Sequence, residues 1–585
     1  MISSNDQQIL HLLNRSAFGP APGDVDRVRQ MGRKAYLDEQ LHPEQIDDSA
    51  VEKRLLQLPT LGMSSEELIE YFPPPRKAGK AIEGAARPQN AEGQAGAAQA
   101  NSGERQRPQD RQAMRAEQRL AALKGPQRVV VELAREEIWR AVYSKRQLQE
   151  VMVQFWMNHF NIYASKGPDR WLLTSFERDT IRPHALDKFE NLLVATAKSP
   201  AMLFYLDNWS SSAPPLNYVE TLEHRKISNS GEAYQRDGFR RAYYEPGFGR
   251  FGGFGGGMFR RGMANRQMGR RRPGGKQKRA SRGLNENYGR ELMELHTLGV
   301  NGGYTQQDVI EVARCLTGWT ILRPRQEAEF FFNPRMHDYN PKLVLGHKFP
   351  AGRGMEDGLE VLHLLAHHPS TAKFISTELC RRFVADDPPQ SVVDRAAGAF
   401  QTTGGDIREV VTAILTSPEF DSPAVYRTKV KSPIEYIASS LRAVGGDTDA
   451  GLPIIMTLDR MGHPMFQYEA PSGYADRAGT WINSSTLLWR LNFAMLLAAN
   501  RLPGTEVRLG NLLAASGNPS GQDLVNGVAE QLFGEPASPA TVEAILSKGG
   551  LGARFEEAAY TPGRNHPEVA TIAGLLLASP QFQRR

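Results

Sequence analysis

The chain has 585 residues and a net charge of +6 at neutral pH, and it contains no run of about 18 consecutive apolar residues. This length suits several ordinary domains or one large body with inserts, and the missing apolar run excludes a membrane-spanning helix. The N-terminal segment lacks a basic stretch followed by an apolar core, so no secretory signal is seen. We therefore expect a cytoplasmic protein by default, with export together with a partner as an open alternative.

Composition divides the chain into six segments. We expect an N-terminal helical segment (1–75), a low-complexity insert (76–127), a first part of the helical core (128–235), a Gly/Arg-rich disordered insert (236–283), a second part of the core (284–445) and a C-terminal loop and helical segment (446–585). Apolar residues at helical spacing recur in every segment except the inserts. The sequence thus predicts a mainly α, multi-helical body with a minor β-hairpin.

The second insert carries the excess positive charge. Residues 236–282 contain 14 Lys or Arg against two acids, a net +12, so the rest of the chain sums to −6. Its Gly, Arg and Phe repetition is typical of disorder and resembles tails that bind single-stranded nucleic acid through charge and stacking. Weak binding of a polyanion or nucleic acid through 236–283 and a solvated surface loop are the two open interpretations.

A central helix is predicted around 151–160, because this stretch is apolar on nearly all sides. His159 points into its apolar arc. It is either a metal ligand or general acid/base, or a neutral core histidine bonded to a backbone carbonyl, and the second interpretation is favoured.

The densest polar cluster of the sequence lies between Asn285 and Trp319. Asn285 can cap a helix that runs to Leu298, and Gly299 supplies its end. At roughly 100° per residue, Glu291 falls inside the apolar stripe of this helix and His296 on its flank. A carboxyl group on a buried face must be paired, hydrogen-bonded, metal-bound or protonated.

Arg290 lies on the wetter side of the same helix, where it could pair with a carboxylate or a bound anion. Thr305 and Asp308 resemble a capping box that opens a second helix, and the short turn between the helices favours an antiparallel pair.

Two apolar runs after Trp319, at 328–333 and 342–349, flank the sequence HDYNP and predict a small β-hairpin. His337 and Asp338 would then lie at its turn. A loop histidine beside an aspartate is a candidate ligand or acid/base pair, although turn chemistry also accounts for Asp338.

Several of these motifs occur together in one known family. The run NEN-x-x-REL-x-ELHTLGV-x-GGYT-x-x-DV, together with HLLNRSAFGP, FWMNHF, SPAMLFYLDN and KVKSPIEYIASSLRA, resembles the bacterial domain-of-unknown-function 1800 family. The resemblance covers nearly the whole chain apart from the two inserts. It implies a mostly helical bacterial protein of unassigned activity, with a member of the exported domain-of-unknown-function 1501 family as a partner suggested by gene neighbourhood.

The candidate site is a buried centre formed by His159, Glu291 and His296, with His337 and Asp338 as a lid. His and carboxylate ligands suit a divalent zinc, iron or manganese ion, and Glu291, His159 and Arg290 would carry metal-assisted hydrolysis or oxidation. No phosphate-binding loop, nucleophile elbow, HExxH or CxxC motif is present. The competing hypothesis, slightly favoured, is a non-enzymatic scaffold in which Glu291 pairs with an arginine.

Overall fold

The computed structural model describes residues 5–73, 125–213, 283–324, 326–509, 521–548 and 567–585. The inserts expected at 76–127 and 236–283 lie outside these ranges, apart from 125–127 and 283. Within the described ranges helices dominate, as the sequence predicted, and the strands form three short antiparallel pairs. In the same ranges, no helix combines the length and apolar character needed to cross a membrane.

The N-terminal half of the fold is helical throughout. Its α-helices are α1 (Asn5–Ser16), α2 (Asp24–Met31), α3 (Arg33–Leu41), α4 (Ser49–Leu55), α5 (Ser65–Tyr71), α7 (Gln127–Tyr143), α8 (Gln147–His159), α9 (Asp169–Ser175), α10 (Phe189–Lys198) and α11 (Pro200–Tyr205). A π-helix, Phe176–Ile181, continues α9. The expected central helix is α8, whose Val151, Met152 and Trp156 are fully buried.

The middle of the chain contains most of the strands. It comprises α13 (Glu286–Glu291), a π-helix (Leu292–Thr297), α14 (Gln306–Cys315), β1 (Trp319–Leu322), β2 (Glu329–Phe332), β3 (Lys342–Val344), β4 (His347–Phe349), α15 (Met355–Ala366), α16 (Pro369–Phe383), α17 (Gln390–Thr403) and α18 (Ile407–Leu415). The predicted β content is present, but its pairing differs. β1 pairs with β2 and β3 with β4, so 328–333 and 342–349 belong to two separate hairpins.

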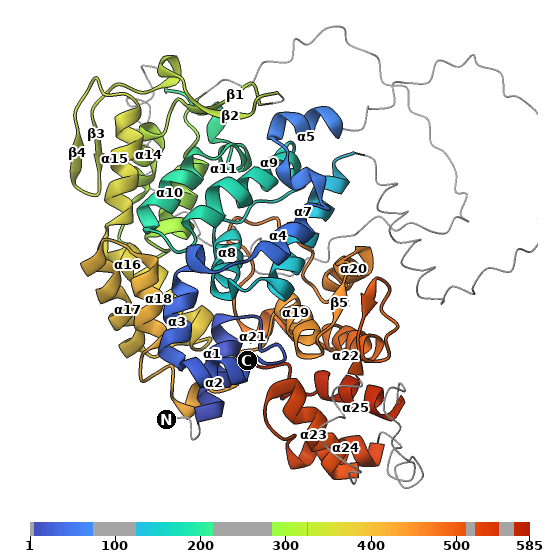
Figure 1. Ribbon diagram of the computed structural model, residues 1–585. Coiled ribbons are helices and arrows are strands. Elements are labelled where there is room, and N and C mark those ends of the chain that lie inside the picture. The colour runs from blue at the N-terminus through green and yellow to red at the C-terminus, as the bar shows by residue number, and fades with distance from the viewer. Residues whose placement is uncertain (1–4, 74–124, 214–282, 325, 510–520, 549–566) are drawn as a thin grey trace, which may run out of the picture.

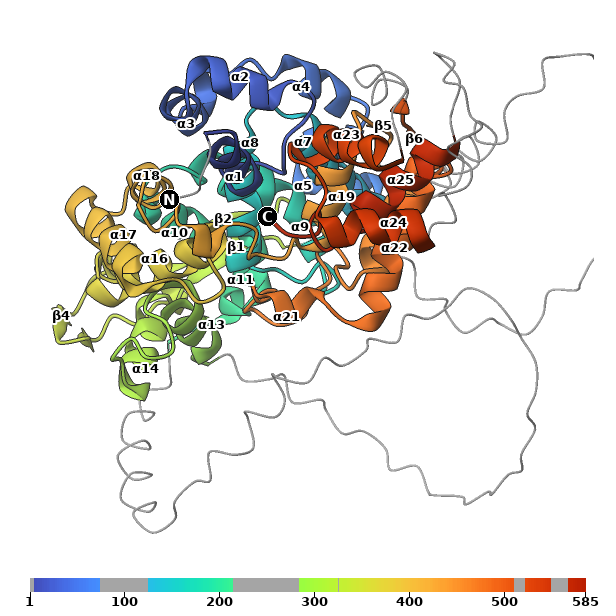
Figure 2. The same cartoon turned by 90° about the horizontal axis from the view of Figure 1, so that it is seen from below.

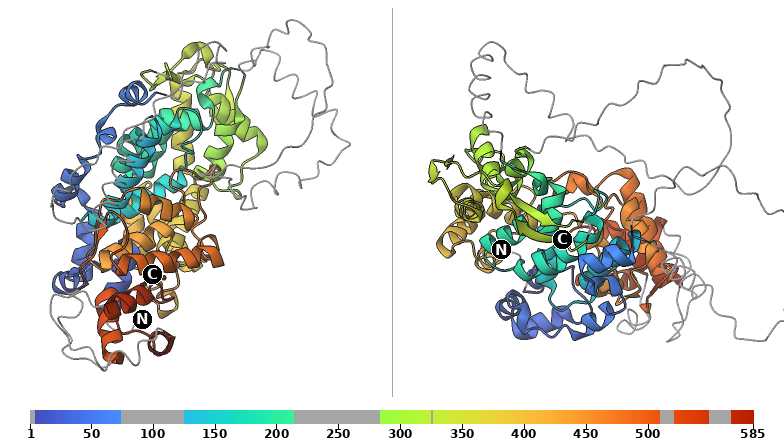
Figure 3. Two further views of the ribbon diagram at one scale, coloured as in Figure 1. Left: turned by 90° about the vertical axis from the view of Figure 1, so that its right-hand side faces the viewer. Right: turned by 90° about the horizontal axis from the view of Figure 1, so that it is seen from above.

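The C-terminal part returns to helices. It comprises α19 (Pro433–Ala443), β5 (Asp447–Thr448), α20 (Leu452–Arg460), α21 (Ala478–Trp481), α22 (Ser484–Ala498), β6 (Thr505–Glu506), α23 (Gly521–Phe533), α24 (Pro539–Lys548) and α25 (Pro567–Leu577). Seen in Figure 1, α8 lies between α16–α18 on one side and α19, α20 and α22 on the other. From below, α1–α4 and α13–α14 lie on opposite sides of the body (Figure 2). The left view of Figure 3 places the C-terminal helices at the end remote from β1–β4.

One connected hydrophobic core joins these elements, since it includes buried residues from Ile9 in α1 to Phe582 after α25. Local signals fix several helix starts: Thr305 and Asp308 form the predicted capping box of α14, and Asn285 caps α13. Because this core includes residues from every described segment, it does not mark boundaries between them. The six-segment division of the chain therefore stays a prediction.

Candidate functional site

The structure brings His159 and His296 together at the end of α8. Their ring centroids are 6.2 Å apart, and His159 Nε2 lies 3.2 Å from the carbonyl oxygen of His296. A carbonyl only accepts, so this nitrogen donates, as the core-histidine interpretation predicts. Burial lowers the pKa of His159 to about 4, and burial followed by the neighbouring His159 lowers the pKa of His296 well below its usual value. Both rings are therefore neutral at pH 7.

Glu291 ends α13 and is half-buried. Burial, helped by the Glu294 carboxylate and opposed by Arg290, raises its pKa to about 7. The backbone becomes a π-helix directly after Glu291, with Leu298 N–H donating five residues back to Met293 at 2.9 Å. The apolar stripe predicted at 100° per residue therefore does not give the side-chain directions of the residues after Glu291, including His296. A turn of π-helix contains more residues than a turn of α-helix, so each residue advances by a smaller angle.

Arg290 does not enter the expected centre. Its guanidinium donates to the Gln306 side chain at 2.8 Å and lies 3.9 Å from the Glu286 carboxylate. The scaffold hypothesis expected an arginine paired with Glu291. Among the described residues no ion pair to Glu291 is formed, and the nearby Arg290 directs its contacts to the other side of the helix.

His337 and Asp338 are buried between the two hairpins, each with partners from the fold. His337 Nδ1 donates to the Thr317 carbonyl at 2.8 Å, and Asp338 accepts from Arg314 Nε at 2.7 Å. Burial, the largest single effect, raises the pKa of Asp338, but the hydrogen bonds from Arg314 and the Asn340 N–H, together with the charges of Arg314 and Lys342, lower it below its usual value. These side chains therefore hold α14 to the hairpins and do not form the exposed turn expected from the sequence. A lid role for them stays without support.

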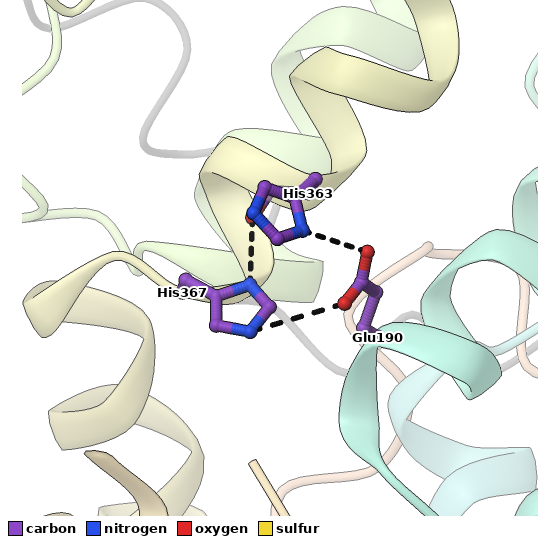
Figure 4. Close-up of side chains that lie close together, drawn as sticks. All are labelled: Glu190, His363 and His367. Carbon is purple, nitrogen blue, oxygen red and sulfur yellow. Dashed lines mark hydrogen bonds and ion pairs between the residues drawn. The ribbon is translucent and has the colours of Figure 1, made fainter. Parts of the chain in front are cut away.

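A different group has the residue types and spacing of a metal site. Among the described residues, Glu190, His363 and His367 are the one set of three His, Cys, Asp or Glu whose ligand atoms all lie within 4.8 Å of one another. His363 Nδ1 lies 2.9 Å from Glu190 Oε1, and His367 Nε2 lies 3.8 Å from Glu190 Oε2 (Figure 4). The set expected from the sequence, with His159, Glu291, His296, His337 and Asp338, contains no such group.

Packing explains why these three side chains meet. α15 buries Val361, Leu362 and Leu365 and packs against α10, and His363 in its last turn stays exposed. The buried Phe189 opens α10 with its N–H bonded to the Gly405 carbonyl at 2.8 Å. Glu190, the next residue, is half-buried and reaches the two imidazoles.

The tautomer of His367 suits metal binding, whereas His363 Nδ1 donates to the Glu190 carboxylate and would have to give up that proton for an ion to bind. His367 Nδ1 lies 3.0 Å from the carbonyl oxygen of His363 and must donate to it, which leaves the lone pair on Nε2, the atom that faces Glu190. Ligands bound tetrahedrally to zinc at about 2.0–2.1 Å lie about 3.3 Å apart. The observed 2.9 and 3.8 Å separations bracket this value and the third is at most 4.8 Å, so side-chain rotations would be needed to place all three ligands around one ion.

Sequence reasoning missed this group. The spacing of His363 and His367, one helical turn apart, was the available signal, because residues four apart share a helix face. Glu190 could not be added from the sequence, since it is 173 positions away from His363 and only the packing of α10 on α15 joins them.

Asp169 is a second ionisable residue that the sequence did not reveal. Its side chain is fully buried at the start of α9, and neither carboxyl oxygen has a hydrogen-bond partner among the described residues. Burial raises its pKa to about 9, against the lowering effect of Lys166. Asp169 is therefore protonated at pH 7.

Comparison with known proteins identifies the family and nothing narrower. No curated protein and no solved structure matches the chain. The model of one family, described as Protein of unknown function (DUF1800), matches residues 11–584. Since this match spans nearly the whole chain, the protein belongs to the DUF1800 family.

Proposed function

We propose that the protein binds one divalent transition-metal ion through Glu190, His363 and His367. The observation that carries this proposal is the convergence of two imidazole nitrogens and one carboxylate within 4.8 Å of one another. Two histidines with one carboxylate are a ligand set found around catalytic zinc and around non-haem iron(II). Manganese, a harder ion, suits the carboxylate better than the imidazoles.

The surroundings of the three ligands favour a reactive site over a purely structural one. Their side chains are 60% exposed for His363, 39% for His367 and 31% for Glu190. Coordination positions left by the protein would therefore face water, as in catalytic sites, whereas structural zinc sites are closed by four protein ligands. A bound metal there would supply Lewis acidity and an activated water, so metal-assisted hydrolysis is the reaction class that we assign, with oxidation at iron as its alternative.

The scaffold function retains separate support from the buried ion pairs. Arg182 pairs with both Glu150 and Glu177, and Arg382 pairs with Glu435, deep in the helical body. Such networks account for buried carboxylates without any chemistry. A partner from the domain-of-unknown-function 1501 family belongs with this hypothesis, and co-purification of the two proteins expressed together would test it.

Alanine at His363 or His367 should abolish stoichiometric metal binding. Each substitution removes one of three ligands, so the dissociation constant for zinc should rise by at least about 100-fold, beyond the effect of losing an outer-shell partner. The measurement is elemental analysis of the full-length protein after metal loading and desalting, with titration against a coloured chelator for affinity. Binding should also weaken as the pH falls, because protons compete with the metal for its ligand atoms.

The matched control is His347→Ala. His347 also pairs with a glutamate at the surface, with its Nε2 2.6 Å from Glu360 Oε1. Among the described residues it belongs to no group of three potential metal ligands. It should leave metal binding unchanged. Full metal retention by a variant lacking both His363 and His367 would refute the site. If Glu291→Ala loses the metal while the His363 and His367 variants keep it, the metal site is the one predicted from the sequence, around Glu291.

If residues 236–283 bind polyanions, deleting this insert should weaken the binding of polyanions to the protein. The deletion removes 14 cations, so the affinity for single-stranded DNA and the salt dependence of that affinity should both fall, since each released counterion contributes to the salt slope. Fluorescence anisotropy at several salt concentrations measures both quantities. Deleting 76–127 serves as a control, and identical binding curves for the 236–283 deletion and the intact chain would exclude the idea.

A further inference from the structure

A small cavity lies where the C-terminal segment meets the first helix. Its wall comes from α1 and the turn after it, the segment before α19, α19 itself, α23 and the residues that follow α25. Cationic side chains are prominent in it: Arg427, Lys431 and Arg584 all line the cavity. The remaining lining is mixed, with apolar side chains such as Leu532 and Phe582 beside the polar Asn14 and Ser439.

Lys431 is the unusual member of this lining. It is 4% exposed, and its ammonium nitrogen lies 3.8 Å from the centre of the Phe582 ring. Among the described residues, no carboxylate or other hydrogen-bond acceptor pairs with this ammonium. Burial, followed by the Arg427 charge, lowers its pKa well below the usual value. The Lys431 side chain lines the cavity, so an acceptor for its ammonium would have to come from what occupies that space.

The charges behind the cavity do not supply that counter-ion. Arg427 pairs with Glu535 at 2.9 Å, and the buried Glu435 is shared by Arg382 and Arg585. Arg490 is fully buried, and its Nε and Nη1 have no hydrogen-bond partner in the described part of the chain. Cations therefore outnumber acids around Lys431, and the acids present are already engaged.

We propose that this cavity, which has room for about one water-sized sphere, binds a single halide ion at the Lys431 ammonium. The anion would neutralise Lys431 and attract Arg427 and Arg584 from the same wall. It would also join two segments that meet here, since Lys431 N–H donates to the Gln583 carbonyl at 3.0 Å and Val430 forms a β-bridge with Arg584. The site is remote in sequence from the metal ligands and does not depend on them.

Lys431→Met tests the proposal, because methionine keeps an unbranched stem over Phe582 and removes the charge. In the intact protein, sodium chloride should raise the thermal unfolding midpoint above that in sodium gluconate at equal ionic strength. Calorimetric titration with sodium chloride measures the affinity for the halide. In Lys431→Met the dissociation constant should rise at least ten-fold, and the variant without anion should unfold at the wild-type temperature or above it.

Lys198→Met is the matched control. Lys198 is half-buried with its ammonium 5.9 Å from the centre of the Phe330 ring, outside the cavity, so its loss should leave the anion response unchanged. Three results would each overturn the proposal: no anion binding by the intact protein, equal binding by Lys431→Met, or a Lys431→Met variant that is less stable than wild type in gluconate.

Discussion

Replacing Arg182 with alanine is expected to destabilise the fold by about 3–5 kcal/mol, the range for breaking a buried ion pair. The guanidinium donates to Glu150 at 2.8 Å and to Glu177 at 2.9 Å, and these carboxylates are 4% and 0% exposed. Removing the cation leaves two acids buried without their counter-charge. Chemical denaturation at pH 7 measures the loss in free energy of unfolding.

Arg508→Ala is the control, because Arg508 pairs with the exposed Glu506 and such surface pairs contribute at most about 1 kcal/mol. Adding Glu150→Gln and Glu177→Gln to Arg182→Ala should restore part of the stability, since the buried groups are then neutral. A loss below about 1 kcal/mol in Arg182→Ala, or no recovery in the triple variant, would show that the network contributes little to the fold.

Local signals explain why so much of the fold was predictable. The caps at Asn285 and Thr305, and the apolar faces of helices such as α1 and α8, are encoded within one or two turns of sequence. The direction of the Glu291 side chain relative to His296 is not encoded locally in this way, because it depends on the π-helical turn between them. Nothing in the pattern of residues 292–297 marks that turn.

The candidate site needed information that a sequence pattern does not hold. His363 and His367 share one helix face, but their third ligand comes from α10. The strand pairing was missed for a similar reason: 328–333 pairs backward with β1, so His337 and Asp338 lie between hairpins rather than at one turn. Tertiary packing decides both arrangements. A single amino-acid sequence does not reveal such distant contacts, which become visible only in the folded structure.

Asp169→Asn is expected to stabilise the protein by up to about 4 kcal/mol at pH 7. The native carboxyl group keeps its proton up to a pKa of about 9, whereas the unfolded chain releases it near the ordinary value of 3.8. Between these values the unfolded state gains about 1.4 kcal/mol per pH unit relative to the native state. The contribution of Asp169 to wild-type stability is therefore complete below pH 4 and falls as the pH rises, and an asparagine, which does not ionise, does not show this loss.

The pH dependence separates this effect from a simple change in packing. The stability difference between Asp169→Asn and wild type should vanish near pH 4 and grow steadily toward pH 8, as measured by denaturant unfolding across that range. Asp179→Asn, at a largely exposed carboxylate, should show no such growth. A difference that stays constant with pH would mean that Asp169 is ionised in the native protein, with a cation or a bound ion beside it. Its burial would then mark a binding site rather than a protonated acid.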